Sequence, residues 1–253
     1  MALRIVTLEE APHLEPALWD ESLRTVWPEF MHHDPSASYF FADGVLAKRH
    51  GYMFAAYEEA EPERLVARAF STPVALGGPG RETLPEGGWD TIVRWAHADL
   101  LDGAATNAVS ALEILVRPDR RSEGLSYRMF DAMRENARKR GASRFVAPVR
   151  PNGKHLEPHT SMQEYALRTR ADGLPADGWL RVHARVGGKI VKVATTSFIV
   201  PGSLEQWRHW TGLPFDASGS VEVPGALNPV TVSLEHNHAV YVEPNVWVEH
   251  SLA

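Results

Sequence analysis

The sequence contains no cysteine among its 253 residues. This absence excludes a disulfide scaffold, a thiolate zinc site and any Cys nucleophile supplied by this chain. It fits a reducing compartment, and we therefore expect a cytoplasmic protein.

Long apolar runs and a strong excess of charge are also lacking. No segment approaches the roughly 18 consecutive apolar residues of a transmembrane helix, so no membrane partner is expected. The first ten residues do not have the basic-then-apolar layout of a signal peptide. The formal net charge of −6 argues against a broad surface for nucleic acid. With 44% hydrophobic and 23% charged residues, the composition is that of a folded globular protein.

The apolar periodicity predicts an α+β chain without a linker long enough to separate two domains. We expect one domain over residues 1–253, with a core over about 1–200 and an extension of a helix and strands over about 201–253. The spacing predicts strands over 3–8, 52–58, 65–76, 108–116, 145–149, 189–200, 221–223, 230–234 and 240–248. It predicts helices over 12–30, 36–49, 89–101, 125–140, 179–186 and 203–212.

The segment 108–149 carries the most information. Ala108–Val116 is an apolar run that suits a buried strand, and Glu113 is its single acid. A polar loop follows, then an amphipathic helix that Gly141 ends, then a second short strand. This order predicts a βαβ crossover whose loop opens directly into a helix. Free backbone N–H groups at such a helix start bind anions such as phosphate.

The loop resembles a motif of a known family. The pattern Val116-x-Pro118-x-x-Arg121-Ser122-x-Gly124-Leu125-Ser126 is similar to the acetyl-CoA pyrophosphate loop of the GNAT acyltransferase superfamily. A second similarity lies in 181–188, where His183 stands at the position of a family Tyr. The resemblance implies a central mixed sheet flanked by helices.

The resemblance also implies an activity. It indicates an N-acyltransferase that uses acetyl-CoA, or another acyl-CoA, and a small-molecule or peptide amine as acceptor. Because no Cys is present to form an acyl-enzyme, the amine is expected to attack directly in a ternary complex. The alternative is a non-catalytic CoA-binding sensor or interaction module of the same fold. A metal-dependent hydrolase is the least favoured possibility, and a homodimer stays open.

The resemblance assigns the acyl-CoA contacts to the loop, to the end of the strand before it and to an Asn after the next strand. One of the two strand residues would donate a backbone N–H to the thioester oxygen. The expected residues are Leu115, Val116, Arg120, Arg121, Ser122, Glu123, Gly124, Leu125, Ser126 and Asn152.

Three residues are candidates for proton transfer. Glu113 is either a general base or the partner of a structural Arg, because a carboxylate in an apolar strand needs a partner. His183 is either a general acid or a structural His, and Tyr165 is the rival acid.

Further polar residues are candidates for acceptor binding or for metal ligation. Arg168, Glu243 and Asn245 are candidates for acceptor binding, with ordinary surface positions as the alternative. The pair His236 and His238 is typical of a polar hairpin turn, and 32–34 of a helix end, so no metal site is expected.

Overall fold

The computed structural model describes residues 2–42 and 44–252. Its strands are β1 Leu3–Thr7, β2 Met53–Glu58, β3 Glu61–Val74, β4 Ala108–Val116, β5 Arg144–Val149, β6 Lys189–Ser203, β7 Gly219–Val221, β8 Val230–Ser233 and β9 His238–Ser251. Its α-helices are α1 Glu21–Arg24, α2 Ser38–Phe41, α3 Gly88–Asp102, α4 Leu125–Lys139, α5 Met162–Ala166, α6 Gly178–Arg185 and α7 Leu204–Thr211. Short 3₁₀ turns connect several of these elements.

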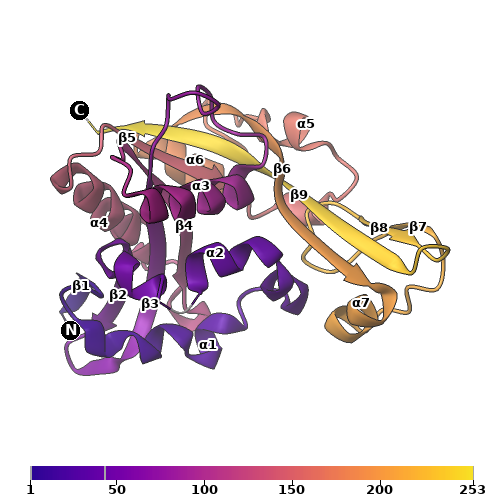
Figure 1. The fold of residues 1–253 in the computed structure, drawn as a ribbon, viewed down its shortest axis with the longest axis horizontal. Helices are drawn as coiled ribbons and strands as arrows, with labels where there is room; N and C mark the ends of the chain where they lie inside the picture. The colour runs from indigo at the N-terminus through magenta and orange to yellow at the C-terminus, as the bar shows by residue number, and fades with distance from the viewer. Residues whose placement is uncertain (1, 43, 253) are drawn as a thin grey trace.

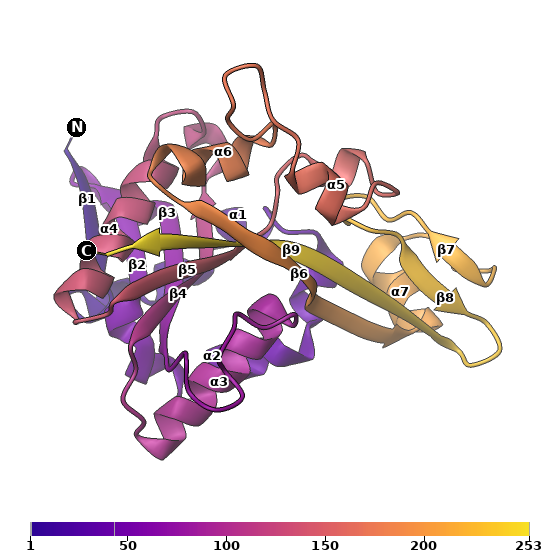
Figure 2. The ribbon, with the colours of Figure 1, turned by 90° about the horizontal axis from the view of Figure 1, so that it is seen from above.

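The strands form one mixed sheet in the order β1-β2-β3-β4-β5-β9-β8-β7, and β6 also pairs with β9. β4 and β5 are parallel, and the other pairs are antiparallel. Helices α4 and α3 lie against the sheet (Figures 1 and 2). The predicted α+β class with a central mixed sheet is confirmed.

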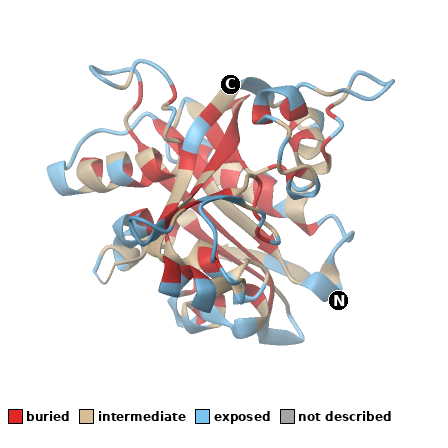
Figure 3. Cartoon of the chain, turned by 90° about the vertical axis from the view of Figure 1, so that its right-hand side faces the viewer, coloured by how far each residue is buried: buried red, intermediate tan, exposed pale blue. Residues whose placement is uncertain are grey.

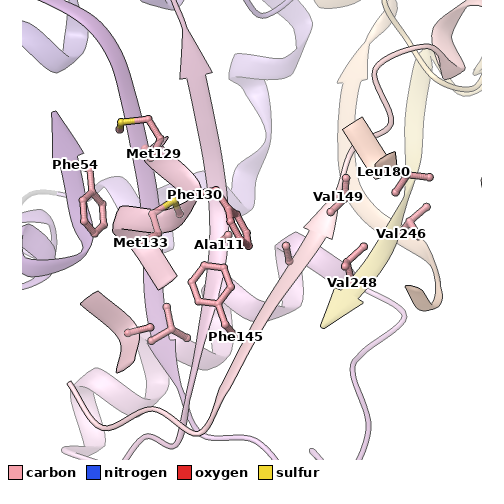
Figure 4. Close-up of a cluster of buried hydrophobic side chains, with 14 of the residues drawn as sticks. Phe54, Ala111, Met129, Phe130, Met133, Phe145, Val149, Leu180, Val246 and Val248 are labelled. Carbon is pink, nitrogen blue, oxygen red and sulfur yellow. The ribbon is translucent and has the colours of Figure 1, made fainter. Parts of the chain in front are cut away.

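Helix α4 is held by the apolar stripe that the sequence predicts. Met129, Phe130 and Met133 are buried and point at the strands, where Phe130 meets Phe145 edge-on at 5.4 Å (Figure 4). Burial of such side chains contributes about 1.5–3 kcal/mol each, so this stripe fixes the start of α4 relative to β4 and β5.

The prediction of long helices in the first 50 residues is wrong. The span 12–30 contains two 3₁₀ turns, the short helix α1 and part of a third turn. Pro12 and Pro16 each start a turn, and Pro28 precedes the next one. A proline inside a helix removes a hydrogen bond and clashes with the preceding turn. The span 36–49 is also interrupted, between α2 and the 3₁₀ turn Leu46–Tyr52.

The last strand lies inside the sheet. β9 pairs with β6 along one edge, and with β5 and β8 at different places along the other. In Figure 1, β6 and β9 run together from the body of the protein to α7, β7 and β8 on the right. Residues 204–237 are therefore an insertion between two central strands, and 238–251 belong to the central sheet.

Buried residues follow the central strands and the inner faces of the helices, while loops are largely exposed (Figure 3). Among the described residues, no helix has the length and apolarity that a membrane span needs.

Candidate active site

The site begins where β4 and β5 separate. The two strands pair only from Ala108 to Ser110 on β4, opposite Arg144 to Val146 on β5. Beyond this point β4 continues beside β3 and β5 continues beside β9. The facing backbone edges of the two strands are therefore left without a ladder, so they are available to an extended ligand.

A bulge in β4 marks the same level of the sheet. Phe70 pairs with Glu113 and Ser71 pairs with Ala111, which leaves Leu112 as the extra residue. The Trp89 indole donates a hydrogen bond of 3.3 Å to the Leu112 carbonyl oxygen. Bulges of this kind redirect backbone and side-chain groups next to functional sites.

The 117–126 loop lies at the other end of the gap. Ser122 and Gly124 have φ of +70° and +74°, and residues 121–124 are exposed. A Cβ on Gly124 would meet no atom within 4 Å, so the backbone at the start of α4 is open. The first N–H groups of a helix have no partner inside it, and they carry its positive dipole end. This loop has the geometry of an anion cradle.

The two neighbouring arginines of the loop have different surroundings. Arg120 binds Glu58 and Glu123, both at 2.7 Å, so it ties the loop to the end of β2. Arg121 is exposed and makes no ion pair within 2–42 and 44–252. Arg121 is thus the loop cation that is free to meet an anionic ligand.

A cavity of about 290 Å³ lies at the diverging strands, where it touches Leu112 and Pro148. We call it the acceptor cavity. Its walls come from the N-terminal turns, β3, β4, the start of α3, the end of β5, β6 and β9. The lining is mainly aromatic and ionisable: Trp19, Arg24, Trp27, His32, Phe41, Arg68, Phe70, Trp89, Glu113, Arg150, Phe198, Glu243 and Asn245.

Glu113 and Arg68 form the first of two ion pairs in this cavity. Arg68 Nε donates to Glu113 Oε1 at 2.7 Å, and the Trp27 indole donates to Glu113 Oε2 at 2.8 Å. Glu113 therefore has a structural Arg partner, which is the alternative to its role as a general base. Its side chain still lines the cavity.

Glu243 and Arg150 form the second pair. Arg150 Nε donates to both Glu243 oxygens at 3.0–3.1 Å. The Tyr241 hydroxyl and the Asn245 amide also donate to Glu243, at 2.6 and 3.0 Å. Arg150 in turn lies over the Trp27 ring at 5.6 Å, so Trp27 contacts both ion pairs.

His32 is the cavity residue whose proton chemistry stands out. Burial and the nearby Arg24 charge lower the pKa of His32 below its ordinary value of 6.5. The imidazole is consequently neutral at pH 7 and has a nitrogen that can accept a proton.

Comparison with known proteins fits this geometry. The chain is 29% identical over 276 aligned residues to the arginine N-acetyltransferase avaD of Aspergillus versicolor, with 97% of this chain and 93% of that protein covered. The structure is similar to the loading GNATL domain of CurA from Lyngbya majuscula, with a TM-score of 0.54, 16% identity and coverage of 100% and 98%. The chain has a GNAT-like fold.

A second GNAT structure is similar over the full length of both chains. The GphF GNAT-like decarboxylase, solved in complex with isobutyryl-CoA, aligns with a TM-score of 0.50 and 14% identity. No family model matches the chain.

The structure places two of the predicted GNAT acceptor residues in the cavity and one elsewhere. Glu243 and Asn245 line the acceptor cavity. Arg168 binds Glu157 and Glu164, both at 2.7 Å, and is not among the lining residues. Among the predicted acyl-CoA contacts, Leu115 is buried in β4, and exposed Asn152 lies beside Gly178 at the start of α6.

The two predicted acids lie outside the cavity lining. His183 is buried, its Nδ1 lies 3.0 Å from Nε2 of His250, and burial lowers the pKa of His183 to about 3. The Tyr165 hydroxyl donates to Asp177 at 3.0 Å, and burial raises the pKa of Tyr165. Their role in proton transfer stays a prediction, and no cavity contact supports it.

Several cavity residues have no clear signal in the sequence. Trp27, Arg68, Trp89 and Arg150 come from four separate segments, and none belongs to a motif. His32 is visible in the sequence only as part of a polar run at an expected helix end. The surplus of 8 Trp is the single hint, because three of them, together with three Phe, line this cavity.

Proposed function

We propose that this protein transfers the acyl group of acetyl-CoA, or of another acyl-CoA, directly to an amine. The acceptor is a free amino acid with a cationic side chain, such as arginine. The protein is an acyl-CoA-dependent N-acyltransferase. The observation that carries the acceptor class is the cavity at the β4–β5 gap, where aromatic walls enclose two carboxylates and three arginines. The name of the Aspergillus relative supports the same class.

The residues of the gap and loop fit an acyl-CoA. The open N–H groups at Gly124, Leu125 and Ser126 suit a pyrophosphate, and Arg121 adds an unpaired positive charge. The edge of β4 that pairs with no strand suits the extended arm of the acyl-CoA, because its backbone groups are available to that arm. When bound, the donor supplies a thioester carbonyl that an amine can attack. Leu112, Leu115 and Val116 are the β4 residues whose backbone we propose to face it.

The acceptor cavity suits a ligand with both signs of charge. A guanidinium is planar and weakly hydrated, so it stacks well on Trp and Phe rings and pairs with carboxylates such as Glu113. The carboxylate of an amino acid needs a cation, and the exposed Arg24, which pairs with Glu29 at 3.2 Å, lines the cavity. A volume of about 290 Å³ matches one amino acid.

His32 is the residue that we propose to take the amine proton. An amine attacks only as the free base, so its ammonium form must lose a proton in the site. Both carboxylates of the cavity already accept two or more hydrogen bonds. His32 is neutral, and an imidazole that donates one ring N–H to the Arg24 backbone keeps its other nitrogen as an acceptor. Glu113 then serves to bind the cationic acceptor.

A steady-state assay tests the acceptor. CoA release from acetyl-CoA would be measured with arginine, citrulline, lysine and decarboxylated arginine. We expect arginine to have the highest kcat/KM. The kcat/KM for citrulline should be at least 10-fold lower because citrulline lacks the side-chain charge. Decarboxylated arginine should also have a lower kcat/KM because it lacks the carboxylate. Binding of CoA without turnover on any amine would instead favour the sensor or interaction module.

The pH profile tests the base. We expect His32→Gln to lower kcat by about 10–100-fold and to remove the acidic limb of the kcat/KM profile. Glu113→Gln should raise the acceptor KM and keep that limb. An acidic limb that survives in His32→Gln and disappears in Glu113→Gln would assign the base to Glu113.

A further inference from the structure

A second cavity holds a buried cation without a counter-ion. The side chain of Arg49 is on the 3₁₀ turn Leu46–Tyr52, and the residue is 2% exposed. It lines a cavity of about 260 Å³ together with Lys48, Pro73 and residues at the carboxyl end of α3. This cavity shares no lining residue with the acceptor cavity.

Most of the guanidinium is unsatisfied. Nη1 donates to the Thr72 hydroxyl, whereas Nε and Nη2 have no partner among the described residues. The guanidinium also lies over the Phe40 ring, whose centre is 5.0 Å from Cζ. A guanidinium has five N–H donors and remains charged at neutral pH, so the three unpaired N–H groups on Nε and Nη2 are costly in a buried position.

The one carboxylate in this lining is already occupied. Asp99 accepts from Arg81 Nη1 at 2.7 and 2.9 Å and from the Ala75 N–H at 2.8 Å. Burial lowers the pKa of Arg49 to about 10, and no charge within residues 2–42 and 44–252 opposes that effect. The described part of the chain therefore provides a desolvated cation and an adjoining space, and its one carboxylate in this lining is already bound.

We propose that this second cavity binds a small carboxylate, which accepts the Nε–H and Nη2–H donors of Arg49 side by side. A planar carboxylate matches this donor pair in a bidentate arrangement. Lys48, which is exposed on the same cavity, adds a second positive charge. Asp99 and the partial negative charge at the end of α3 disfavour a multiply charged anion, so a monoanion fits better than phosphate.

The site has a defined place behind the acceptor cavity. Phe40, which stacks on Arg49, packs edge-on against Phe41 with ring centres 4.8 Å apart. Phe41 lines the acceptor cavity. The carboxylate site is thus separated from the acceptor cavity by the two phenylalanines of α2.

Calorimetric titration of the free protein with sodium acetate tests the proposal, with sodium chloride keeping the ionic strength constant. We expect saturable acetate binding that weakens at least 10-fold in Arg49→Met, while Arg185→Met, which removes an exposed arginine of α6, binds as the wild type does. Phosphate should bind more weakly than acetate. The readout needs neither acyl-CoA nor an acceptor, so it is independent of the proposed transferase reaction.

Other outcomes would overturn the proposal. Equal acetate binding in Arg49→Met would place the acetate elsewhere, for instance at the arginines of the acceptor cavity, and absence of saturable binding would leave only water at Arg49. Lys48→Glu covers the case in which Arg49→Met does not fold, because Lys48 is exposed and its substitution should leave the fold intact. Reversal of the Lys48 charge should lower the affinity for acetate by at least 3-fold. Unchanged affinity in Lys48→Glu would count against the site.

Discussion

In the function that we propose, the two ends of the β4–β5 gap recognise their ligands by different means. At one end, the 117–126 loop presents the free backbone N–H groups at the start of α4, and small side chains matter because they leave the backbone bare. At the other end, side chains from seven separate parts of the chain meet around the acceptor cavity. Recognition by backbone leaves a local pattern in the sequence, whereas recognition by distant side chains leaves none until the chain folds.

Among the substitutions that test this comparison, one at Gly124 should have the largest effect on the kinetics. Gly124→Glu places a carboxylate over the open amides, so we expect kcat/KM for acyl-CoA to fall by at least about 100-fold. The φ of +74° adds only about 1 kcal/mol of strain to the folded state. Steady-state kinetics and thermal unfolding measure the two effects.

Gly80→Glu is the matched control. Gly80 has a φ of +73°, is exposed and has no atom near its Cβ position. It should show the same small loss of stability with normal kinetics. An equal loss of kcat/KM in both variants would mean that backbone strain, not the anion cradle, limits the enzyme.

The second largest effect is expected at Trp27. Trp27→Leu removes the hydrogen bond to Glu113 and the ring beneath Arg150. We expect the acceptor KM to rise by about 10–50-fold with an unchanged KM for acyl-CoA, and Trp27→Phe to lie between, because it keeps a ring without the N–H. A parallel rise in both KM values would show that the two ends are not separate.

A third test concerns two buried carboxyl groups, of which Asp90 follows the cavity residue Trp89. Asp34, between the N-terminal 3₁₀ turns, and Asp90 of α3 interact with each other through a side-chain hydrogen bond. Ser36 and Ile199 N–H groups bind their other oxygens, and Arg94 is the cation near both. Burial raises the pKa of Asp34 to about 6, and burial together with the Asp34 charge raises the pKa of Asp90 to about 8.

These raised pKa values fix the direction of the pH effect. Both groups bind protons more tightly in the folded state, so the free energy of unfolding should fall as the pH rises from about 4 to about 8. Asp90→Asn should remove most of that slope and stabilise the protein by about 2 kcal/mol at pH 8. Denaturant unfolding at several pH values measures this dependence of the unfolding free energy on pH. The control Asp102→Asn, at an exposed position of α3, should keep the slope.

The smallest effect is expected at Arg121. Arg121→Gln removes one exposed cation next to the open amides, so the KM for acyl-CoA should rise about 3-fold at low salt and less at high salt. Arg185→Gln, at another exposed arginine, should not change it. An effect of Arg121→Gln beyond 30-fold would mean that the charge, rather than the backbone, dominates at the loop.

The residues that the sequence could predict are those with local causes. Gly124 and the stripe on α4 act within a few positions, as does Ser203, whose side chain caps the helix predicted over 203–212, so these elements are confirmed. The first 50 residues fold into turns because prolines interrupt an apolar spacing that resembles a helix. The pairing of Glu113 with Arg68 joins residues 45 positions apart, and no local pattern indicates it.

The position of β9 has a consequence for how the protein is made. β9 follows the other strands in the sequence, yet it joins β5 to β6 and β8. During synthesis, the β1–β5 half of the sheet can form early, while Glu243 and Asn245 reach the acceptor cavity only when β9 pairs. Such long-range pairing is slow to form, so the acyl-CoA loop should be assembled on the ribosome before the acceptor cavity exists.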